Sequence, residues 1–164
     1  MASRWWQHLT TTHFALRRHF PPSTLSAIDA AIAASERLHS AEIRCAIETA
    51  LPPWALLRGM PSALRARQVF SNLGMWDTTA NNGVLVYVLL AEHRIEIVAD
   101  RAFSAHVADA EWAAICSEME GAFRAGDFER GTLAAIERIS ELACRHFPAT
   151  GDNRNELPDR TVLL

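Results

Sequence analysis

The sequence predicts an α/β protein: a three-layer α/β/α sandwich around a small mixed sheet of three or four strands. Three observations favour this class. The run 83–91 is apolar at both odd and even positions, which is typical of a strand buried on both faces. A strand pattern at 42–51 precedes it with a helical segment between them, so we expect these two strands to be parallel with a right-handed crossover. The 164 residues, 49% hydrophobic and 21% charged, suffice for one packed domain.

The chain is expected to begin with an amphipathic helix over 3–19, within an N-terminal unit of residues 1–20. On a helical projection, one face collects Trp5, Trp6, Leu9, Leu16 and Phe20. Arg17 and Arg18 lie off that face, and no acidic residue precedes Asp29. Two interpretations remain open. Either the helix packs against its own domain, or the segment 3–19 contacts a membrane surface or a membrane-associated partner through Trp5, Trp6, Arg17 and Arg18.

The main domain is assigned to residues 21–148. Pro21 and Pro22 end the first helix, and Ser23 is expected to cap a second helix over 24–38. In the strand at 42–51, one face carries Glu42, Arg44 and Glu48. Three charges predict a face that is half exposed, at a sheet edge, or lining a site. A helix over 62–73 follows and ends at Gly74.

The second half of the domain is predicted to hold a hairpin and two closing helices. Glu92 and His93 join the strands 83–91 and 94–99, and a two-residue loop would pair Val88 with Ile97. The closing helices begin at Asp109 and Asp127, each with apolar residues at helical spacing. Residues 149–164 form an expected polar tail, in which the apolar residues able to dock are Val162, Leu163 and Leu164.

The composition removes several kinds of chemistry. All 16 basic residues are arginines, so no lysine is available for a Schiff base or a phosphate-binding loop. A net charge of −3 gives no overall attraction to nucleic acid, which is not an expected partner. We expect Cys45, Cys116 and Cys144 to be free thiols in a reducing compartment. No signal peptide or membrane-spanning run is apparent, so a cytoplasmic location is expected.

One group of polar residues is brought together by the predicted topology. A hairpin places the start of one strand beside the end of the next, so Asn81 and Asn82 should meet Asp100 and Arg101. Parallel pairing adds Glu42 at the same end. The candidate metal ligands are the oxygens of Asp77, Asn81, Asn82, Asp100 and Asp109, which suit Ca²⁺ or Mg²⁺; no organic cofactor is expected. The candidate catalytic residues are Glu42 or Asp100 as a base and Arg101 as a phosphate clamp. Alternatively, these residues serve only as turns and caps.

The stretch from Thr24 to Phe147 resembles the TPM domain family. The resemblance rests on Asn82-Gly83-Val84-Leu85-Val86, on Arg94-Ile95-Glu96-Ile97, and on the closing helices with Gly126-Asp127-Phe128 and Gly131. It implies an α/β/α sandwich, a phosphatase label carried by some members, and divalent-metal binding in others. The family often has Asp-Asn-Gly where this chain has Asn81-Asn82-Gly83, so one carboxylate is missing. Ala99-Asp100-Arg101 replaces the usual glycine-rich turn and returns a carboxylate.

The resemblance also bears on partners. Many members carry a signal peptide and a membrane anchor, whereas this chain looks like the short bacterial branch without either. That branch is found alongside membrane-anchored TPM relatives and LemA-type proteins. The first hypothesis is therefore a non-catalytic, divalent-metal-binding module that engages such an envelope-associated partner, peripheral to the inner membrane. The alternative is a metal-dependent phosphatase acting on phosphoesters, in which the cation activates a water molecule.

Overall fold

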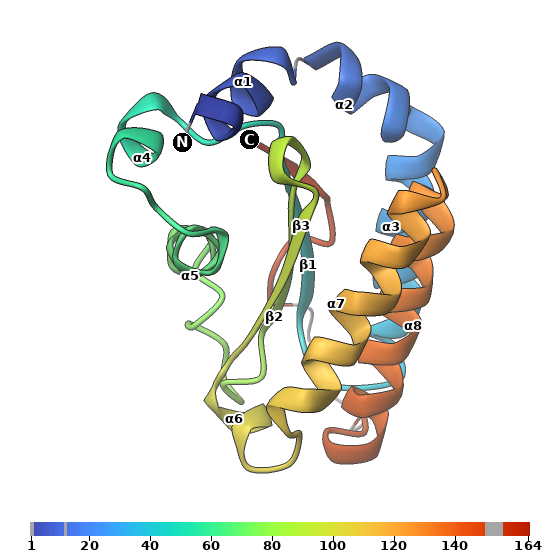
Figure 1. Ribbon diagram of the computed structural model, residues 1–164. Coiled ribbons are helices and arrows are strands. Elements are labelled where there is room, and N and C mark those ends of the chain that lie inside the picture. The colour runs from blue at the N-terminus through green and yellow to red at the C-terminus, as the bar shows by residue number, and fades with distance from the viewer. Residues whose placement is uncertain (1, 12, 150–155) are drawn as a thin grey trace.

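A mixed sheet forms the middle layer of the molecule, in a computed structural model that describes residues 2–11, 13–149 and 156–164 (Figure 1). Its four strands in the described part of the chain run in the order β3-β2-β1-β4. Their bounds are β1 Ile43–Glu48, β2 Val84–Leu89, β3 Arg94–Ala99 and β4 Val162–Leu163. β1 is parallel to β2 and to β4, whereas β3 is antiparallel to β2. The predicted three-layer α/β/α sandwich with a small mixed sheet is confirmed.

Three long helices cover one face of the sheet (Figure 1): α3 (Pro22–Ser35), α7 (Asp109–Arg124) and α8 (Phe128–His146). They pack on alternate strand residues, among them Ile43, Cys45 and Val86. The helical spacing predicted for the first closing helix is confirmed, because Ile115, Met119 and Phe123 are its buried residues.

Two shorter helices, α4 (Pro53–Leu57) and α5 (Ser62–Asn72), cover the opposite face. There the strands contribute Ala46, Leu85, Tyr87 and Leu89. All six residues of β2 are buried, as the two-faced apolar pattern predicts. Gly83 precedes β2 because a Cβ atom at that position would lie 2.4 Å from the carbonyl oxygen of Met75.

The N-terminal segment differs from the predicted single helix over 3–19. It forms α1 (Ala2–Thr10) and α2 (His13–His19), and Thr12 between them lies outside the described residues. Leu16 and Phe20 are buried, but Trp6 and Leu9 are exposed. The predicted common face is therefore wrong, because two separate helices do not share one helical phase.

The strand β1 is central, not half exposed or at an edge. β4 pairs with Ala46 and Ile47 on its outer side, and Glu48 is only 2% exposed. The predicted hairpin register is also wrong by two residues, because Val88 pairs with Ile95. The connection is longer than two residues: it consists of the 3₁₀ turn η1 (Leu90–Glu92) and His93, which has a left-handed φ of 51°.

Several helix starts shift by one or two residues from the predicted caps. Pro21 occupies the N-cap position of α3, and Ala108 that of α7, so neither Ser23 nor Asp109 is the cap. Asp127 does occupy the N-cap position of α8. A short helix that the sequence did not indicate, α6 (Arg101–Ser104), is capped by Asp100. Of the predicted tail, 150–155 lie outside the described residues. No helix within the described ranges has the length and apolar character needed to cross a bilayer.

Candidate functional site

The predicted polar group forms where β2 begins and β3 ends, beside α6 (Figure 1). The backbone N–H of Asp100 donates to the carbonyl of Gly83 at 2.8 Å, and that of Ala102 donates to the carbonyl of Asn81 at 3.1 Å. The Arg101 guanidinium donates to Oδ1 of Asn81 at 2.6 Å. Asn81 has a left-handed φ of 52°, which asparagine tolerates better than most residues. The hairpin therefore brings Asn81, Asn82, Asp100 and Arg101 together, as the topology predicts.

Two oxygens in this group stand out because they are buried without a hydrogen-bond donor in the part of the chain that the structure describes. The first is Oδ1 of Asn82, whose Nδ2 donates to the carbonyl of Ser40 at 2.9 Å. The second is Oδ2 of Asp100, whose Oδ1 accepts the backbone N–H of Arg101 at 2.7 Å. Buried polar atoms are nearly always satisfied by protein, water or an ion. These two oxygens therefore have the capacity to accept from water or to coordinate a cation.

Glu42 has a different role from the one predicted. Its two carboxylate oxygens accept the backbone N–H groups of Glu156 and Leu157, at 2.9 and 3.1 Å. Burial raises the pKa of the Glu42 carboxyl, although these two hydrogen bonds oppose the shift. The neighbouring Glu36 accepts the N–H of Ile43 at 2.7 Å, and burial raises its pKa to about 9. Glu42 thus fixes the segment that leads into β4.

The remaining predicted ligands, Asp77 and Asp109, are exposed. Asp77 follows a turn in which its N–H donates to Gly74, and Asp109 is the first residue of α7. Within the described ranges, neither carboxylate hydrogen-bonds to the Asn82–Asp100 group. The same ranges hold no group of three or more His, Cys, Asp or Glu residues arranged to bind a metal. A cation at this end would therefore rely on few protein ligands.

Two of the three cysteines, Cys45 and Cys116, are poor nucleophiles. All three are free thiols, as predicted. Burial raises the pKa of Cys45 to about 12 and that of Cys116 to about 11. Both thiols are protonated at neutral pH, and the thiolate is the reactive form.

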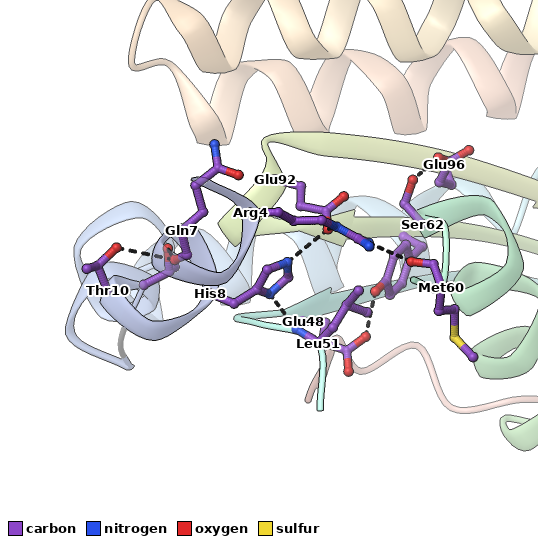
Figure 2. Close-up of polar contacts among 12 residues, drawn as sticks. Arg4, Gln7, His8, Thr10, Glu48, Leu51, Met60, Ser62, Glu92 and Glu96 are labelled. Atoms are coloured by element: carbon purple, nitrogen blue, oxygen red, sulfur yellow. Dashed lines mark hydrogen bonds and ion pairs between the residues drawn. The ribbon is translucent and has the colours of Figure 1, made fainter. Parts of the chain in front are cut away.

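A second polar cluster, which no sequence pattern predicts, attaches α1 to the domain (Figure 2). His8 Nε2 donates to Glu92 at 2.8 Å, and His8 Nδ1 accepts the N–H of Leu51 at 2.9 Å. Because Nδ1 is an acceptor, the ring is the neutral tautomer with its proton on Nε2. Arg4 donates to Glu92 at 2.6 Å and to the carbonyl of Met60 at 2.5 Å. Of the two open interpretations, packing of this segment on its own domain is shown for α1.

A third cluster lies between β1, β2 and α5. The buried Glu48 carboxylate accepts the Tyr87 hydroxyl at 2.5 Å, and Nε and Nη2 of Arg65 at 2.9 and 2.8 Å. Burial and the Glu48 charge raise the pKa of Tyr87 well above its usual range. The one available signal was a lone tyrosine inside an otherwise aliphatic strand. The cluster neutralises a carboxylate that faces the apolar layer under α5.

The fold and the polar loops define a small α/β/α domain with its candidate site at the end of the sheet where β2 begins. The chain belongs to the TPM domain family, whose model matches residues 17–142. It is similar to the BA42 protein of the psychrophilic bacterium Bizionia argentinensis, whose NMR structure shares 29% identity with a TM-score of 0.76 over 87% of this chain and 93% of that one.

The N-terminal domain of the cg2496 protein from Corynebacterium glutamicum has the same fold, with a TM-score of 0.55 and 17% identity over 74% of this chain and 72% of that one. No curated protein matches the chain in sequence.

Proposed function

We propose that this TPM-domain protein is a non-catalytic module that binds a divalent cation, Ca²⁺ or Mg²⁺, and engages a partner at the cytoplasmic side of the cell envelope. The observation that carries the cation site is the pair of buried acceptors, Oδ1 of Asn82 and Oδ2 of Asp100, that lack donors in the described part of the chain. Both belong to one loop junction, because the N–H of Asp100 bonds to Gly83.

The chemistry of these oxygens fits a hard cation. Ca²⁺ and Mg²⁺ prefer carboxylate and amide oxygens and complete their coordination with water. Asn81, Asp77 and Asp109 are the further oxygen donors that we propose from the adjoining loops. Because the ligand set contains few carboxylates, we expect weak binding, with a Kd on the order of 10⁻⁴ to 10⁻³ M.

An NMR titration tests the cation site. Chelator-stripped protein is titrated with Ca²⁺ and then with Mg²⁺, while two-dimensional amide spectra are recorded. We expect shifts confined to the neighbourhood of Asn82 and Asp100, and their loss in Asp100→Asn. Glu137→Gln, which removes one charge from an exposed position of α8, is the matched control and should titrate like the wild type. Absence of shifts at millimolar metal, or equal shifts in Asp100→Asn, would remove these residues from cation binding.

The second candidate is metal-dependent hydrolysis of phosphoesters, favoured by one observation: the Arg101 guanidinium lies beside the proposed cation ligands. Its weakness is the proposed base Glu42, whose carboxylate is already occupied by two backbone N–H groups. Turnover of p-nitrophenyl phosphate in the presence of Mg²⁺ decides between the two candidates. Metal-dependent turnover that is abolished in Asp100→Asn would favour the hydrolase, whereas no turnover by a metal-loaded protein favours the binding module.

The proposed partner is reached through the N-terminal segment. Of the residues predicted for this contact, Trp6, Arg17 and Arg18 are exposed, whereas Trp5 is partly buried against the domain. A membrane-anchored TPM relative or a LemA-type protein is the partner that we propose from the family resemblance. Co-purification of such a protein with this chain from detergent-solubilised membranes, lost in Trp6→Ala, supports this engagement, and unchanged co-purification in Trp6→Ala contradicts it.

A further inference from the structure

One end of the molecule gathers exposed apolar side chains. α1 and α2 run across the end of the sheet opposite to α6, and α4 lies at the same end (Figure 1). Contacts from α1 hold these parts together, because Arg4 bonds to Met60 just after α4 and His8 bonds to Leu51 just before it. The large exposed side chains are Trp6 (66% exposed), Leu9 (68%), Phe14 (76%), Trp54 (44%) and Leu57 (76%). These helices form the surface that we call the α1–α2–α4 face.

The α1–α2–α4 face is also basic. Residues 1–28 and 49–76 contain no aspartate or glutamate, although the whole chain carries a net charge of −3. Arg17 and Arg18 are exposed and form no ion pair with any described residue. The Arg58 guanidinium lies 5.9 Å above the ring of Trp54, so a cation accompanies an exposed aromatic there as well.

Three side-chain carboxylates beside this face already have hydrogen-bond partners within the described chain. Glu92 contacts α1 and is bound by Arg4 and His8. Asp127 and Glu129 line a pocket together with Arg18 at the end of α2. Asp127 is paired with Arg130 at 2.6 Å, and Glu129 accepts the hydroxyl of Thr24 at 2.5 Å.

A groove of about 990 Å³ continues this surface between α2, α3 and β4. Its apolar lining includes Phe14, Phe20, Leu25 and Leu163, and Arg17 also lines it. Phe14 and Leu163 lie outside the segment 17–142 that matches the TPM domain. The groove is therefore built in part from segments of this chain that precede and follow the matched domain.

We infer that the α1–α2–α4 face docks on an anionic lipid bilayer. Tryptophan, phenylalanine and leucine insert at the boundary between headgroups and acyl chains, and arginines bind the anionic headgroups. The inference rests on the proposed engagement of the envelope and adds lipid to it: the surface contacts the bilayer in which the proposed partner is anchored. The proposed cation site lies at the opposite end of the sheet, beside α6, so the two sites can be tested separately (Figure 1).

Vesicle co-sedimentation tests the inference. The protein is mixed, in chelator, with vesicles of equal parts phosphatidylglycerol and phosphatidylcholine, and with vesicles of phosphatidylcholine alone. We expect binding to the anionic vesicles that weakens with added salt. Reversing one charge with Arg17→Glu should weaken binding roughly thirty-fold, because each arginine near an anionic surface contributes a several-fold gain and two unit charges are lost. Arg138→Glu, an equal charge change at an exposed position of α8, is the control and should bind like the wild type.

The contribution of the exposed apolar side chains to bilayer binding is tested by alanine substitution and by tryptophan fluorescence. Phe14→Ala and Leu57→Ala should weaken binding, whereas Leu38→Ala, at an exposed leucine just beyond the end of α3, should not. With brominated lipid, tryptophan quenching should fall in Trp6→Phe and Trp54→Phe but persist in Trp76→Phe, which lies in the loop between α5 and β2.

Failure to bind anionic vesicles, or equal binding to phosphatidylcholine alone, overturns the inference. Binding to native membranes that disappears after protease treatment of those membranes, with no binding to pure lipid, would assign the face to a protein instead. The chelator removes divalent cations from the vesicle assay. The result therefore does not depend on whether the proposed cation site binds metal.

Discussion

The Tyr87→Phe substitution removes the hydroxyl group that donates a hydrogen bond to the buried carboxylate of Glu48. The phenyl ring retains the packing of Tyr87 beneath α5, and Arg65 still donates to both carboxylate oxygens. The loss is therefore confined to the 2.5 Å hydrogen bond. A hydrogen bond to a charged group contributes about 1.5–3 kcal/mol, so we expect the free energy of unfolding at neutral pH to fall by about 2 kcal/mol.

The difference in the free energy of unfolding between the wild type and Tyr87→Phe should become smaller at alkaline pH. Burial holds the pKa of folded Tyr87 well above its usual range. An acid whose folded-state pKa is raised contributes stability below its unfolded pKa, about 10 for tyrosine, and loses that contribution as the pH rises further. The wild type then loses about 1.4 kcal/mol per pH unit relative to the phenylalanine variant, so a 2 kcal/mol difference closes near about pH 11.5. Cys45 and Cys116 are present in both proteins, so their contributions cancel.

Urea unfolding of both proteins at a series of pH values measures the difference. Tyr87 is the single tyrosine of the chain, so tyrosinate absorbance reports on it alone. Ser62→Ala removes another 2.5 Å hydrogen bond, to Glu96, without removing a titrating group, and its effect should stay constant over the alkaline range. The reasoning is refuted if the Tyr87→Phe difference is equally constant, or if tyrosinate forms near about pH 10 while the protein remains folded.

Three further substitutions test other parts of the structure. Gly83→Ala should lower the free energy of unfolding by about 1–3 kcal/mol, because its Cβ would meet the Met75 carbonyl. Thermal unfolding checks this, and Gly121→Ala, whose Cβ would meet only the end of the Arg124 side chain at 4.0 Å, should not be destabilising. His8→Ala leaves the N–H of Leu51 without its acceptor and should speed amide hydrogen exchange throughout α1, while unchanged exchange would contradict the anchoring role. Glu36 has its pKa raised to about 9, so wild-type stability should fall as the pH rises from 4.5 to 9. Glu36→Gln should lose that slope, and identical pH profiles of denaturant midpoints would count against the assignment.

Features set by local pattern and connectivity could be predicted from the sequence. β2 is apolar at both odd and even positions, and helices cover both of its faces. Asn81 and Arg101 were expected to meet because a hairpin joins them, and that expectation survives a register error of two residues. The register failed because η1 and His93 lengthen the connection, which depends on the backbone conformation of one residue.

Features that depend on distant contacts could not be predicted. The sequence pattern places Glu42 and Glu48 on an exposed strand face. In the structure their partners come from elsewhere in the chain: Glu42 accepts a backbone N–H from a residue 114 positions away. His8 looks like one of several scattered histidines until Leu51 and Glu92 are placed beside it. The break after Thr10 changes which side chains of α1 face the domain, and no proline or glycine marks it.

The pairing of β4 with β1 can form only after β1, β2 and β3 have all been synthesised. Residues 156–164 leave the ribosome after the other three strands. Until then, the backbone groups on the outer side of β1 that pair with β4 have no partner from that strand. An open strand edge of this kind is prone to pairing with other chains. Contacts across so much of the sequence also form slowly. The nascent chain is therefore expected to be more prone to aggregation before β4 is made than after β4 has paired with Ala46 and Ile47.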